Sequence, residues 1–498
     1  MSMPHETGAL NPELEKTLAD LRTLVHQAAR DGTAVHEVER AIWDQVLRIG
    51  RQALQLFFTL HGSGDQGPTV HLPDGRALDR LPDRHPRRYV SIFGAFDLRR
   101  TAYGRREGQK IDFVPLDNRL QLPAGAFSYV LQDWDQALCA EQAFGQVNTT
   151  IARMLGLKQS VDSLEQMNRE VAGAATPFRL NRPVPPAAEE GEVFVVSADG
   201  KGVVLRRGSD DPAPPAYRTK GDKASHKRMA TVGTAYSVDR YVRTPEQVVA
   251  ALFRDGPRPE AGRPQPRHKQ VWASLPQADV PVSGMEAVFV WLLWELGRRN
   301  PGGAKEVVYL SDGQDALWDA QAQYLGGRRA VGVLDLLHVT PRLWKAAHVF
   351  HPEKSPEAEA VVREWLLRVL RGQVARVVHG LRVRGGRRPL TAAKRQALRE
   401  VCGYLEKNAP RMRYDEYLAA GYPIASGVIE GACRHLVKDR MERAGMHWTI
   451  PGAQAMLEVR SIYVSGQWEE YQAYRIAQET QRLYPYRDAA DPQYAMAG

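Results

Sequence analysis

The chain has 498 residues and an ordinary globular composition, with 43% hydrophobic and 25% charged residues and a net charge of +9. Its three cysteines are scattered and form no CxxC pair, so neither a disulfide framework nor a cysteine-rich zinc site is indicated. No apolar window approaches the roughly 18 residues of a membrane span, and the first residues lack the apolar core of a secretory signal. We therefore expect a cytoplasmic protein without a membrane partner. The positive net charge fits a polyanionic binding partner.

The N-terminal third is predicted to be mainly helical and to bind DNA. We expect a helical region at 1–80, a small β-hairpin region at 81–125 and a helix-turn-helix-like DNA-binding region at 126–175. In the last of these, a short helix ends at Gly156, and Ser160 can cap a second helix with one apolar face. The second helix of such a motif enters the major groove, although plain helical hairpins share the pattern.

The remainder is predicted to be an α/β domain with a helical interruption. A Pro-rich linker at 176–190 precedes expected strands at 192–198, 203–207, 229–239, 305–311 and 329–335, with helices at 284–298 and 314–325 between them. Strands alternating with helices predict helices packed on a sheet. We expect the first part of this core at 191–339, an all-helical insertion domain at 340–422, a core helix carrying Glu430 at 423–465, and a C-terminal helix and tail at 466–498.

Three short acidic motifs are the most informative feature of this α/β region. In two of them a run of β-formers leads into Asp199-Gly200 and Asp312-Gly313, and the third places Glu430 in a helical segment. Taken singly, Asp-Gly is a common turn signal, and a helical Glu is usually solvated. An α/β fold can bring the three together, and three such carboxylates can hold a pair of divalent ions for phosphodiester chemistry.

Basic residues concentrate in two stretches. Residues 201–228 carry eight Lys/Arg against three Asp, a net charge of 8 − 3 = +5, and 382–395 carries six Lys/Arg and no acid. Either stretch could be a solvated loop, but their position beside the carboxylates favours contacts with DNA phosphates. The candidate DNA-binding residues are Lys220, Lys223, Lys227, Arg228, Arg382, Arg384, Arg387 and Arg388.

Two further cations follow Glu430 on its own helix. Arg434 and Lys438 lie about one and two helical turns beyond it and are expected to share its face. They could hold DNA phosphates beside the ions or act as i, i+4 partners of the Glu.

The motifs resemble those of DDE transposases of bacterial insertion sequences, closest to the ISKra-type family. The matching segments are Ser197–Gly202, Leu310–Gly313, Ser426–Met441 and Gly445–Trp448. The resemblance implies an RNase H-like mixed sheet with flanking helices, interrupted by an all-helical insertion. It also implies that Asp199, Asp312 and Glu430 are the catalytic residues and hold two Mg²⁺ or Mn²⁺ ions.

Related transposases share a signature that Asp335 and His338 match, which implies a supporting role for these two residues. Many members of the family carry a cysteine pair near the stretch Tyr103–Glu107, and this chain has none, so zinc is not expected there. Val437 stands seven residues after Glu430, and the hairpin-forming chemistry of another insertion-sequence family is therefore not expected.

The resulting hypothesis is a DNA transposase. It would bind double-stranded DNA at terminal inverted repeats, cut it and join the released end to target DNA, as a homodimer or higher oligomer in the bacterial nucleoid. Two alternatives remain open: a catalytically silent DNA-binding protein derived from a transposase, and an RNase H-like nuclease or resolvase that cuts without joining. The presence of all three acids counts against the silent form.

Overall fold

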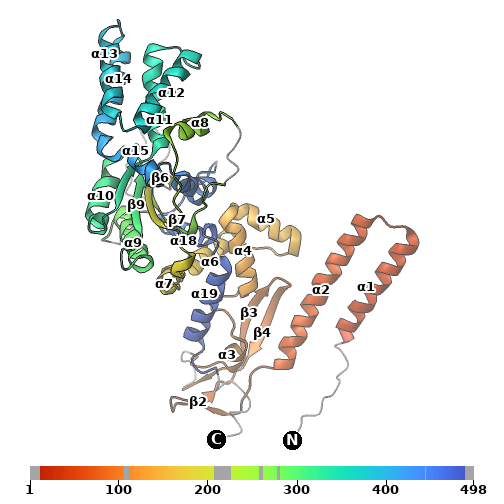
Figure 1. Ribbon diagram of the computed structural model, residues 1–498. Coiled ribbons are helices and arrows are strands. Elements are labelled where there is room, and N and C mark those ends of the chain that lie inside the picture. The colour runs from red at the N-terminus through yellow and green to blue at the C-terminus, as the bar shows by residue number, and fades with distance from the viewer. Residues whose placement is uncertain are drawn as a thin grey trace, which may run out of the picture. The chain divides into compact units, whose positions relative to one another are not determined.

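The computed structural model describes residues 12–105, 111–206, 226–256, 262–276, 281–443 and 445–487 (Figure 1). The chain forms two compact units. The first comprises Met1–Ala174 with Glu469–Gly498, and the second comprises Ala175–Trp468. No helix among the described residues combines the length and the apolar character that crossing a bilayer requires.

The first unit begins with a helical pair and continues into short strands. Helices α1 (Pro12–Asp31) and α2 (Val35–His61) pack side by side. Strands β1 (Thr69–His71), β2 (Ala77–Arg80) and β5 (Tyr103–Gly104) form one antiparallel sheet, and β3 (His85–Ser91) pairs with β4 (Gly94–Arg100). A short helix, α3, spans Pro115–Leu120. The range 1–80, predicted to be helical, therefore contains two strands near its end.

Three packed helices follow in the region predicted to bind DNA: α4 (Tyr129–Glu141), α5 (Phe144–Leu155) and α6 (Val161–Ala172). Gly156 ends α5 with a φ of 68°, and the Ser160 hydroxyl caps α6 by accepting from the Ser163 amide at 3.0 Å. Most of α19 (Trp468–Leu483) belongs to this unit, where the Tyr471 hydroxyl donates to the Val171 carbonyl. The helix, glycine turn and capped second helix expected from the sequence are all present.

The second unit is built on a five-stranded mixed sheet in the order β10-β9-β6-β7-β8. Strand β7 (His226–Val238) pairs antiparallel with both β6 (Val193–Leu205) and β8 (Arg267–Ser274). Strands β9 (Glu306–Ser311) and β10 (Val331–Leu334) are added parallel to β6. The α/β class and the mixed sheet predicted from the sequence are confirmed.

Two features of this sheet differ from the prediction. Strand β6 is continuous through Asp199 and Gly200, because β7 pairs with all of it from Val193 to Leu205. The Asp-Gly pair is therefore not a turn. Strand β8 was missed, because prolines and the charged run Arg267–Lys269 hide its alternation, as is common for edge strands.

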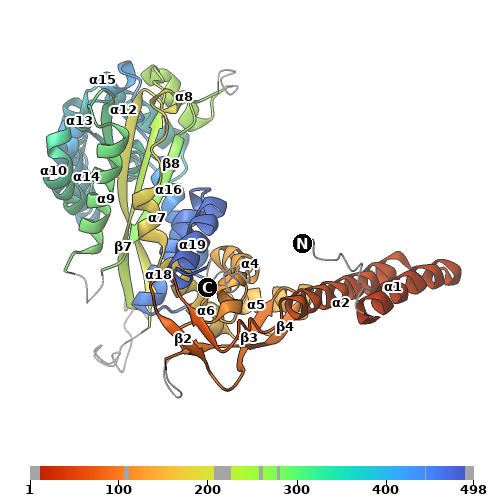
Figure 2. The ribbon, with the colours of Figure 1, turned by 90° about the horizontal axis from the view of Figure 1, so that it is seen from below.

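Helices cover both faces of the sheet. A Cβ at Gly233 of β7 would lie 2.6 Å from Val288 of α9 (Gly284–Arg299), so α9 packs directly on one face, where α10 (Asp315–Leu325) joins it. The other face receives α16 (Gly427–Ala432), a π-helix at Cys433–Lys438, α17 (Asp439–Met441) and α18 (Ile450–Val464). Figure 2 shows α9 and α18 on opposite sides of β7.

Smaller helices complete the unit. Part of the stretch predicted as a Pro-rich linker is helical: α7 spans Ala175–Asn181 and packs on α18. Helix α8 (Pro245–Phe253) lies between β7 and β8 in the chain and packs on α12.

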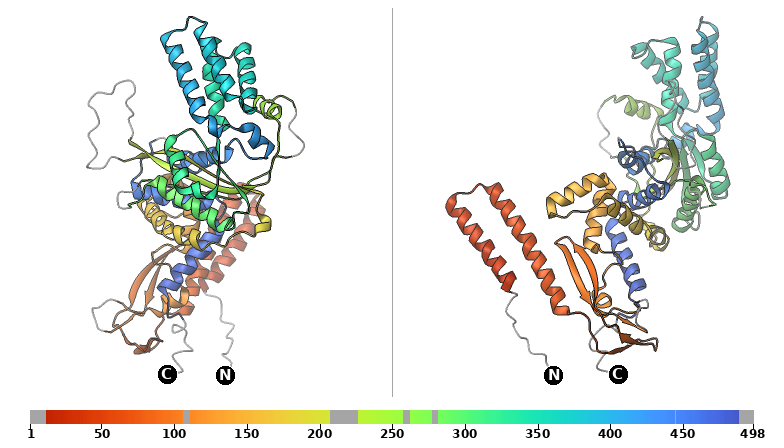
Figure 3. Two further views of the ribbon diagram at one scale, coloured as in Figure 1. Left: turned by 60° about the vertical axis from the view of Figure 1, so that its left-hand side comes forward. Right: turned by 180° about the vertical axis from the view of Figure 1, so that it is seen from behind.

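The interruption between β10 and α16 is entirely helical. It contains α11 (Leu336–Phe350), α12 (Pro356–Leu370), α13 (Val374–Gly386), α14 (Ala392–Asn408) and α15 (Tyr414–Ala419), and Figure 3 shows these helices extending from one end of the sheet. Their buried residues, such as Leu343 and Leu366, belong to the same apolar cluster as the strand residue Val308. The Tyr414 hydroxyl also donates to the Leu334 carbonyl of β10 at 2.8 Å. The insertion and the sheet therefore share one core.

Candidate functional site

Three aspartates lie at one level of the sheet: Asp199 within β6, Asp312 directly after β9 and Asp335 directly after β10, as extending the strand registers by one to three residues shows. Strands β6 and β9 pair with a constant offset, 306 − 193 = 113, which aligns Asp199 with position 199 + 113 = 312. Strands β9 and β10 pair with an offset of 331 − 308 = 23, which aligns Asp312 with position 312 + 23 = 335. In parallel strands, residues in register project from the same face. Asp199, Asp312 and Asp335 are therefore neighbours on the sheet.

Hydrogen bonds join the chain segments that carry these residues. The Ser311 hydroxyl donates to the Ala198 carbonyl at 3.0 Å, and the Asp335 amide donates to the Ser311 carbonyl at 2.8 Å. The Leu336 amide then donates at 2.9 Å to the carbonyl of Ile424, which lies just before α16. These bonds place β6, β9, β10 and the approach to Glu430 side by side.

Local contacts orient the three aspartate side chains. The Asp199 carboxylate accepts from the Gly200 amide at 2.6 Å and from the Cys433 thiol at 3.3 Å. Asp312 accepts from the Gln314 amide at 2.9 Å, and Asp335 caps α11 by accepting from the Leu337 amide at 2.8 Å. Cys433 lies just after α16, so its contact draws that helix toward β6.

Glu430 completes the acidic group from α16. Ser426 caps this helix by accepting from the Ile429 amide at 3.1 Å, and the Glu430 side chain is exposed. One ligand-type atom from each of Asp335, His338 and Glu430 lies within 4.8 Å of the other two. Asp335 is only 1% exposed, and its Oδ2 makes no hydrogen bond among the described residues, although it lies 3.5 Å from Nδ1 of His338. A buried carboxylate oxygen left unbonded beside a His and a Glu fits a bound cation.

The protonation behaviour of the group reflects crowded negative charge. Burial raises the pKa of the Asp312 carboxyl, and the charge of Asp199 raises it further. Burial also raises the pKa of Glu430, together with the charges of Asp335 and Asp199, and the neighbouring Asp335 carboxylate raises the pKa of His338. Positive charge at this place would relieve the repulsion.

The segment after Glu430 departs from a regular α-helix, which changes the predicted positions of Arg434 and Lys438. A π-helix bonds i to i+5, so residues four apart no longer stack. Arg434 is 70% exposed on its side chain and pairs with Asp439 at 3.5 Å, and Lys438 is exposed. The structure thus gives Arg434 a partner other than Glu430. From α18, the buried Arg460 supports the turn by donating to the Leu436 carbonyl at 2.9 Å.

The chain then returns to the far end of β6. The Trp448 amide donates to the Val204 carbonyl at 3.0 Å, and the Arg206 amide donates to the Trp448 carbonyl at 2.7 Å. The segment containing Glu430 is therefore held at both of its ends, by α11 before the helix and by β6 after it.

The predicted basic residues are spread over several elements. Lys220 and Lys223 lie outside the described residues. Lys227 and Arg228 belong to β7, where Lys227 pairs with Glu442 at 3.0 Å. In the second stretch, Arg382 pairs with Glu406 at 2.7 Å, Arg384 stacks over Trp365, and Arg388 stacks over Phe350. Arg387 follows the end of α13.

A basic wall beside Asp312 was missed from the sequence. A cavity of about 520 Å³ is lined by Asp312 and His338 together with Arg342, Lys345 and Tyr404. Arg342 and Lys345 follow His338 by four and seven residues on α11, which is the spacing of one helix face. That spacing could have revealed them.

The outward face of α6 does not favour phosphate contacts. Its exposed or half-buried charged residues are Asp162, Glu165, Arg169 and Glu170, a net charge of 1 − 3 = −2. A recognition helix with this face would have to read base edges, where acidic side chains accept from cytosine, and leave phosphates to other elements.

Comparisons with known proteins give no family. No family model matches the chain, and no curated protein matches it. Among solved structures, it is similar to a chain of the Drosophila P element transposase strand transfer complex, with 10% sequence identity, 74% of this chain and 82% of that chain covered, and a TM-score of 0.23. A TM-score this low is no guide to fold or activity.

Proposed function

We propose that this protein is a DNA transposase that cuts DNA at the ends of an element and joins the released strand to target DNA. The observation that carries the proposal is the in-register row of Asp199, Asp312 and Asp335, with Glu430 brought to it on α16. A five-stranded mixed sheet with helices on both faces is compatible with the RNase H-like fold that this chemistry would use.

Asp199, Asp312 and Glu430 would hold two Mg²⁺ or Mn²⁺ ions. Such ions activate the attacking oxygen and stabilise the leaving oxygen of a phosphodiester. Asp335 would add its unbonded Oδ2, and His338 would add an imidazole nitrogen next to Glu430. A nitrogen ligand suits Mn²⁺ better than Mg²⁺, so we expect Mn²⁺ to support cleavage at a lower concentration than Mg²⁺ does.

The DNA would be held by two parts of the chain. Arg342 stands beside Asp312, where a scissile phosphate would lie, and Lys345 lines the same cavity but pairs with Glu400 at 2.6 Å. Arg228 and the second basic stretch would contact phosphates farther away. The α4–α6 helices would read the terminal inverted repeats of the double-stranded DNA. Joining two element ends in the bacterial nucleoid would require two or more copies of the chain.

A cleavage and strand-transfer assay tests the reaction. The substrates are duplexes made from the DNA on either side of the gene, with Mg²⁺ or Mn²⁺ added, and the variant is Asp199→Asn. Asp315→Asn is the matched control, because Asp315 is exposed and pairs with Lys407 on the surface. We expect cleavage and joining by the wild type and the control, and neither by Asp199→Asn.

The same assay separates the alternatives. Binding without cleavage would indicate the catalytically silent form, and cleavage without joining would indicate a nuclease or resolvase. Undiminished cleavage by Asp199→Asn would refute the metal assignment.

The dependence of DNA affinity on salt tests the basic wall. Each phosphate contact removed should reduce the slope of log K against log [salt] by about 1. We expect this decrease in slope for Arg342→Gln. The decrease should be smaller for Arg382→Gln, because the Arg382 guanidinium already pairs with Glu406. Equal slopes for Arg342→Gln and the wild type would show that Arg342 does not contact a DNA phosphate.

A further inference from the structure

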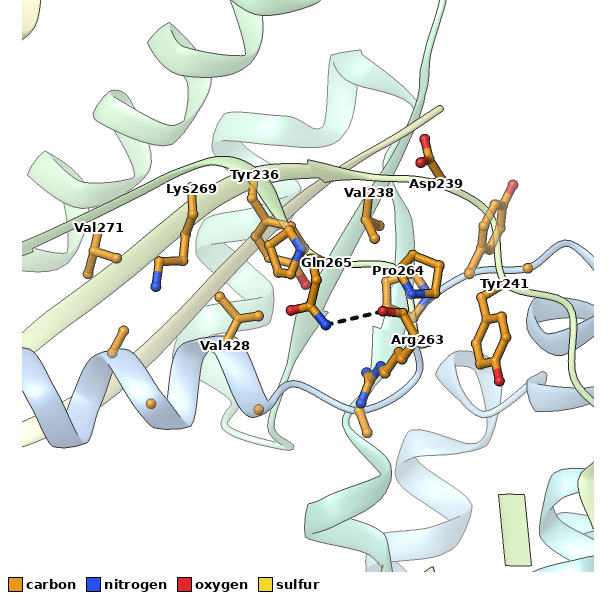
Figure 4. Close-up of a pocket in the computed structure, with 18 of the residues that line it drawn as sticks. Tyr236, Val238, Asp239, Tyr241, Arg263, Pro264, Gln265, Lys269, Val271 and Val428 are labelled. Atoms are coloured by element: carbon orange, nitrogen blue, oxygen red, sulfur yellow. Dashed lines mark hydrogen bonds between the residues drawn. The ribbon is translucent and has the colours of Figure 1, made fainter. Parts of the chain in front are cut away.

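A second cavity lies against the other side of α16. Its volume is about 510 Å³, and β7, β8, the segment 263–266 and the residues around α16 line it. Gly427, Val428 and Gly431 face this cavity, whereas Glu430 faces Asp335 and His338. In Figure 4, Lys269 and Gln265 lie on one side of the cavity and Val428 on the other. The six-residue helix α16 thus separates the cavity from the acidic group.

The cavity is lined by positive charge. Its cationic residues include Arg243, Arg263 and Lys269. Asp239 is the one acid among the described lining residues, and it already pairs with Arg267. The remaining lining residue of basic type, His435, contacts Asp439 at 3.1 Å. Three cations therefore face the cavity without a neutralising acid from the described lining.

Arg243 gives the strongest indication of an anionic ligand. One of its terminal nitrogens donates to the Tyr422 carbonyl at 3.2 Å. Its Nε is buried and has no hydrogen-bond partner among the described residues. Burial and the nearby charge of Arg263 lower the pKa of Arg243. A buried guanidinium nitrogen without an acceptor is costly, and an anion in the cavity would supply one.

The other walls are aromatic. Tyr236, Tyr241 and Tyr422 line the cavity, and the guanidinium carbon of Arg243 lies 5.2 Å from the centre of the Tyr241 ring. Aromatic and guanidinium planes are the surfaces on which unpaired bases stack. A volume of about 510 Å³ is also within the range of small-ligand pockets and exceeds what one inorganic anion needs.

We propose that this cavity binds one nucleotide, with its phosphate held by Arg243, Arg263 and Lys269 and its base packed against the half-buried Tyr241. The nucleotide is either an unpaired residue of a DNA strand or a free nucleotide, since both offer the same groups. Binding itself does not depend on the proposed strand cleavage; only the DNA source rests on that function.

Binding measurements with defined probes test this site. The probes are dAMP, deoxyadenosine, inorganic phosphate and a short single-stranded oligonucleotide, titrated into the full chain. We expect dAMP to bind at least tenfold more tightly than deoxyadenosine or phosphate alone, because the site recognises both halves. Competition then assigns the source: an oligonucleotide that displaces dAMP indicates a DNA strand, and one that does not indicates a free nucleotide.

Two variants test the location. Arg263→Gln combined with Lys269→Gln removes two exposed charges and should weaken dAMP binding at least tenfold, whereas Lys407→Gln on the remote helix α14 should not change it. Gly427→Leu keeps every charge but fills the cavity, because a Cβ at Gly427 meets nothing within 4 Å, and it should also weaken binding.

Unchanged dAMP affinity in both variants, or equal affinity for dAMP and deoxyadenosine, would overturn the proposal. Asp199→Asn should bind dAMP as the wild type does. Failure of the nucleotide-binding proposal would therefore not count against the proposed strand cleavage. Failure of the cleavage assay would likewise not count against nucleotide binding.

Discussion

Replacing Glu430 by Gln should stabilise the metal-free protein. The change removes one negative charge from the acidic group and keeps the side-chain size. Ligand-type oxygens of Asp335 and Glu430 lie within 4.8 Å of each other. Two like charges at that distance repel by about 0.9 kcal/mol in water and by about 3.5 kcal/mol at an effective dielectric constant near 20. Glu430 is exposed, so solvent screening favours the lower end, and we expect a gain of about 1 kcal/mol.

The assay is urea denaturation of the full chain with and without Mg²⁺, with hydrogen exchange on β9 and β10 assigning the transition to the unit that holds the site. Mg²⁺ at about ten times its dissociation constant should raise the unfolding free energy of the wild type by about 1.4 kcal/mol. Glu430→Gln should lose most of this increase. Glu416→Gln is the control, because Glu416 is exposed and pairs with Arg413.

Two results would refute the reasoning. A Glu430→Gln protein less stable than the wild type without metal would show that the carboxylate is not repelled by its neighbours. An unchanged Mg²⁺ effect would show that Glu430 holds no ion.

Three further predictions concern other parts of the chain. Burial raises the pKa of Asp135 from 3.8 to about 7, so the protonated carboxyl stabilises the fold at acidic pH. On the order of 4 kcal/mol of unfolding free energy is lost as the pH rises from about 4 to 7. Urea denaturation of Asp135→Asn should show no such loss. A Cβ at Gly313 would meet the Tyr404 ring at 2.6 Å, so Gly313→Ala should cost about 1–3 kcal/mol and reduce cleavage beside Asp312. Glu190→Gln removes the closer of two carboxylates that pair with the buried Arg299 and leaves only Glu295 at 3.7 Å, so it should cost about 3 kcal/mol by calorimetry, and a cost below about 1 kcal/mol would contradict it.

The local pattern of the sequence was enough to find the three acids and most of their elements. β-Branched residues followed by Asp312-Gly313 marked the end of β9, and helical periodicity located α9 and α10 within a residue or two. These signals depend on neighbours along the chain. The same kind of signal, read along α11, would have added Arg342.

What the sequence could not provide was set by partners far away in the chain. Asp-Gly at 199–200 reads as a turn, and only pairing with β7 shows that the strand continues. The unbonded oxygen of Asp335 depends on burial by several elements at once. The π-helix after Glu430 is likewise supported by Arg460 of α18, which no local propensity indicates.

The double attachment of the Glu430 segment has a consequence for how the protein is made. Trp448 bonds to Val204 of β6, 448 − 204 = 244 residues earlier in the chain. Ribosomes add about 5–20 residues per second, so Asp199 leaves the ribosome roughly ten seconds or more before this contact can form. A growing chain can fold these strands and hold three aspartates in place while the fourth acid, Glu430, is still untethered. Emergence of Trp448 from the ribosome would then be the step that fixes Glu430 beside the three aspartates.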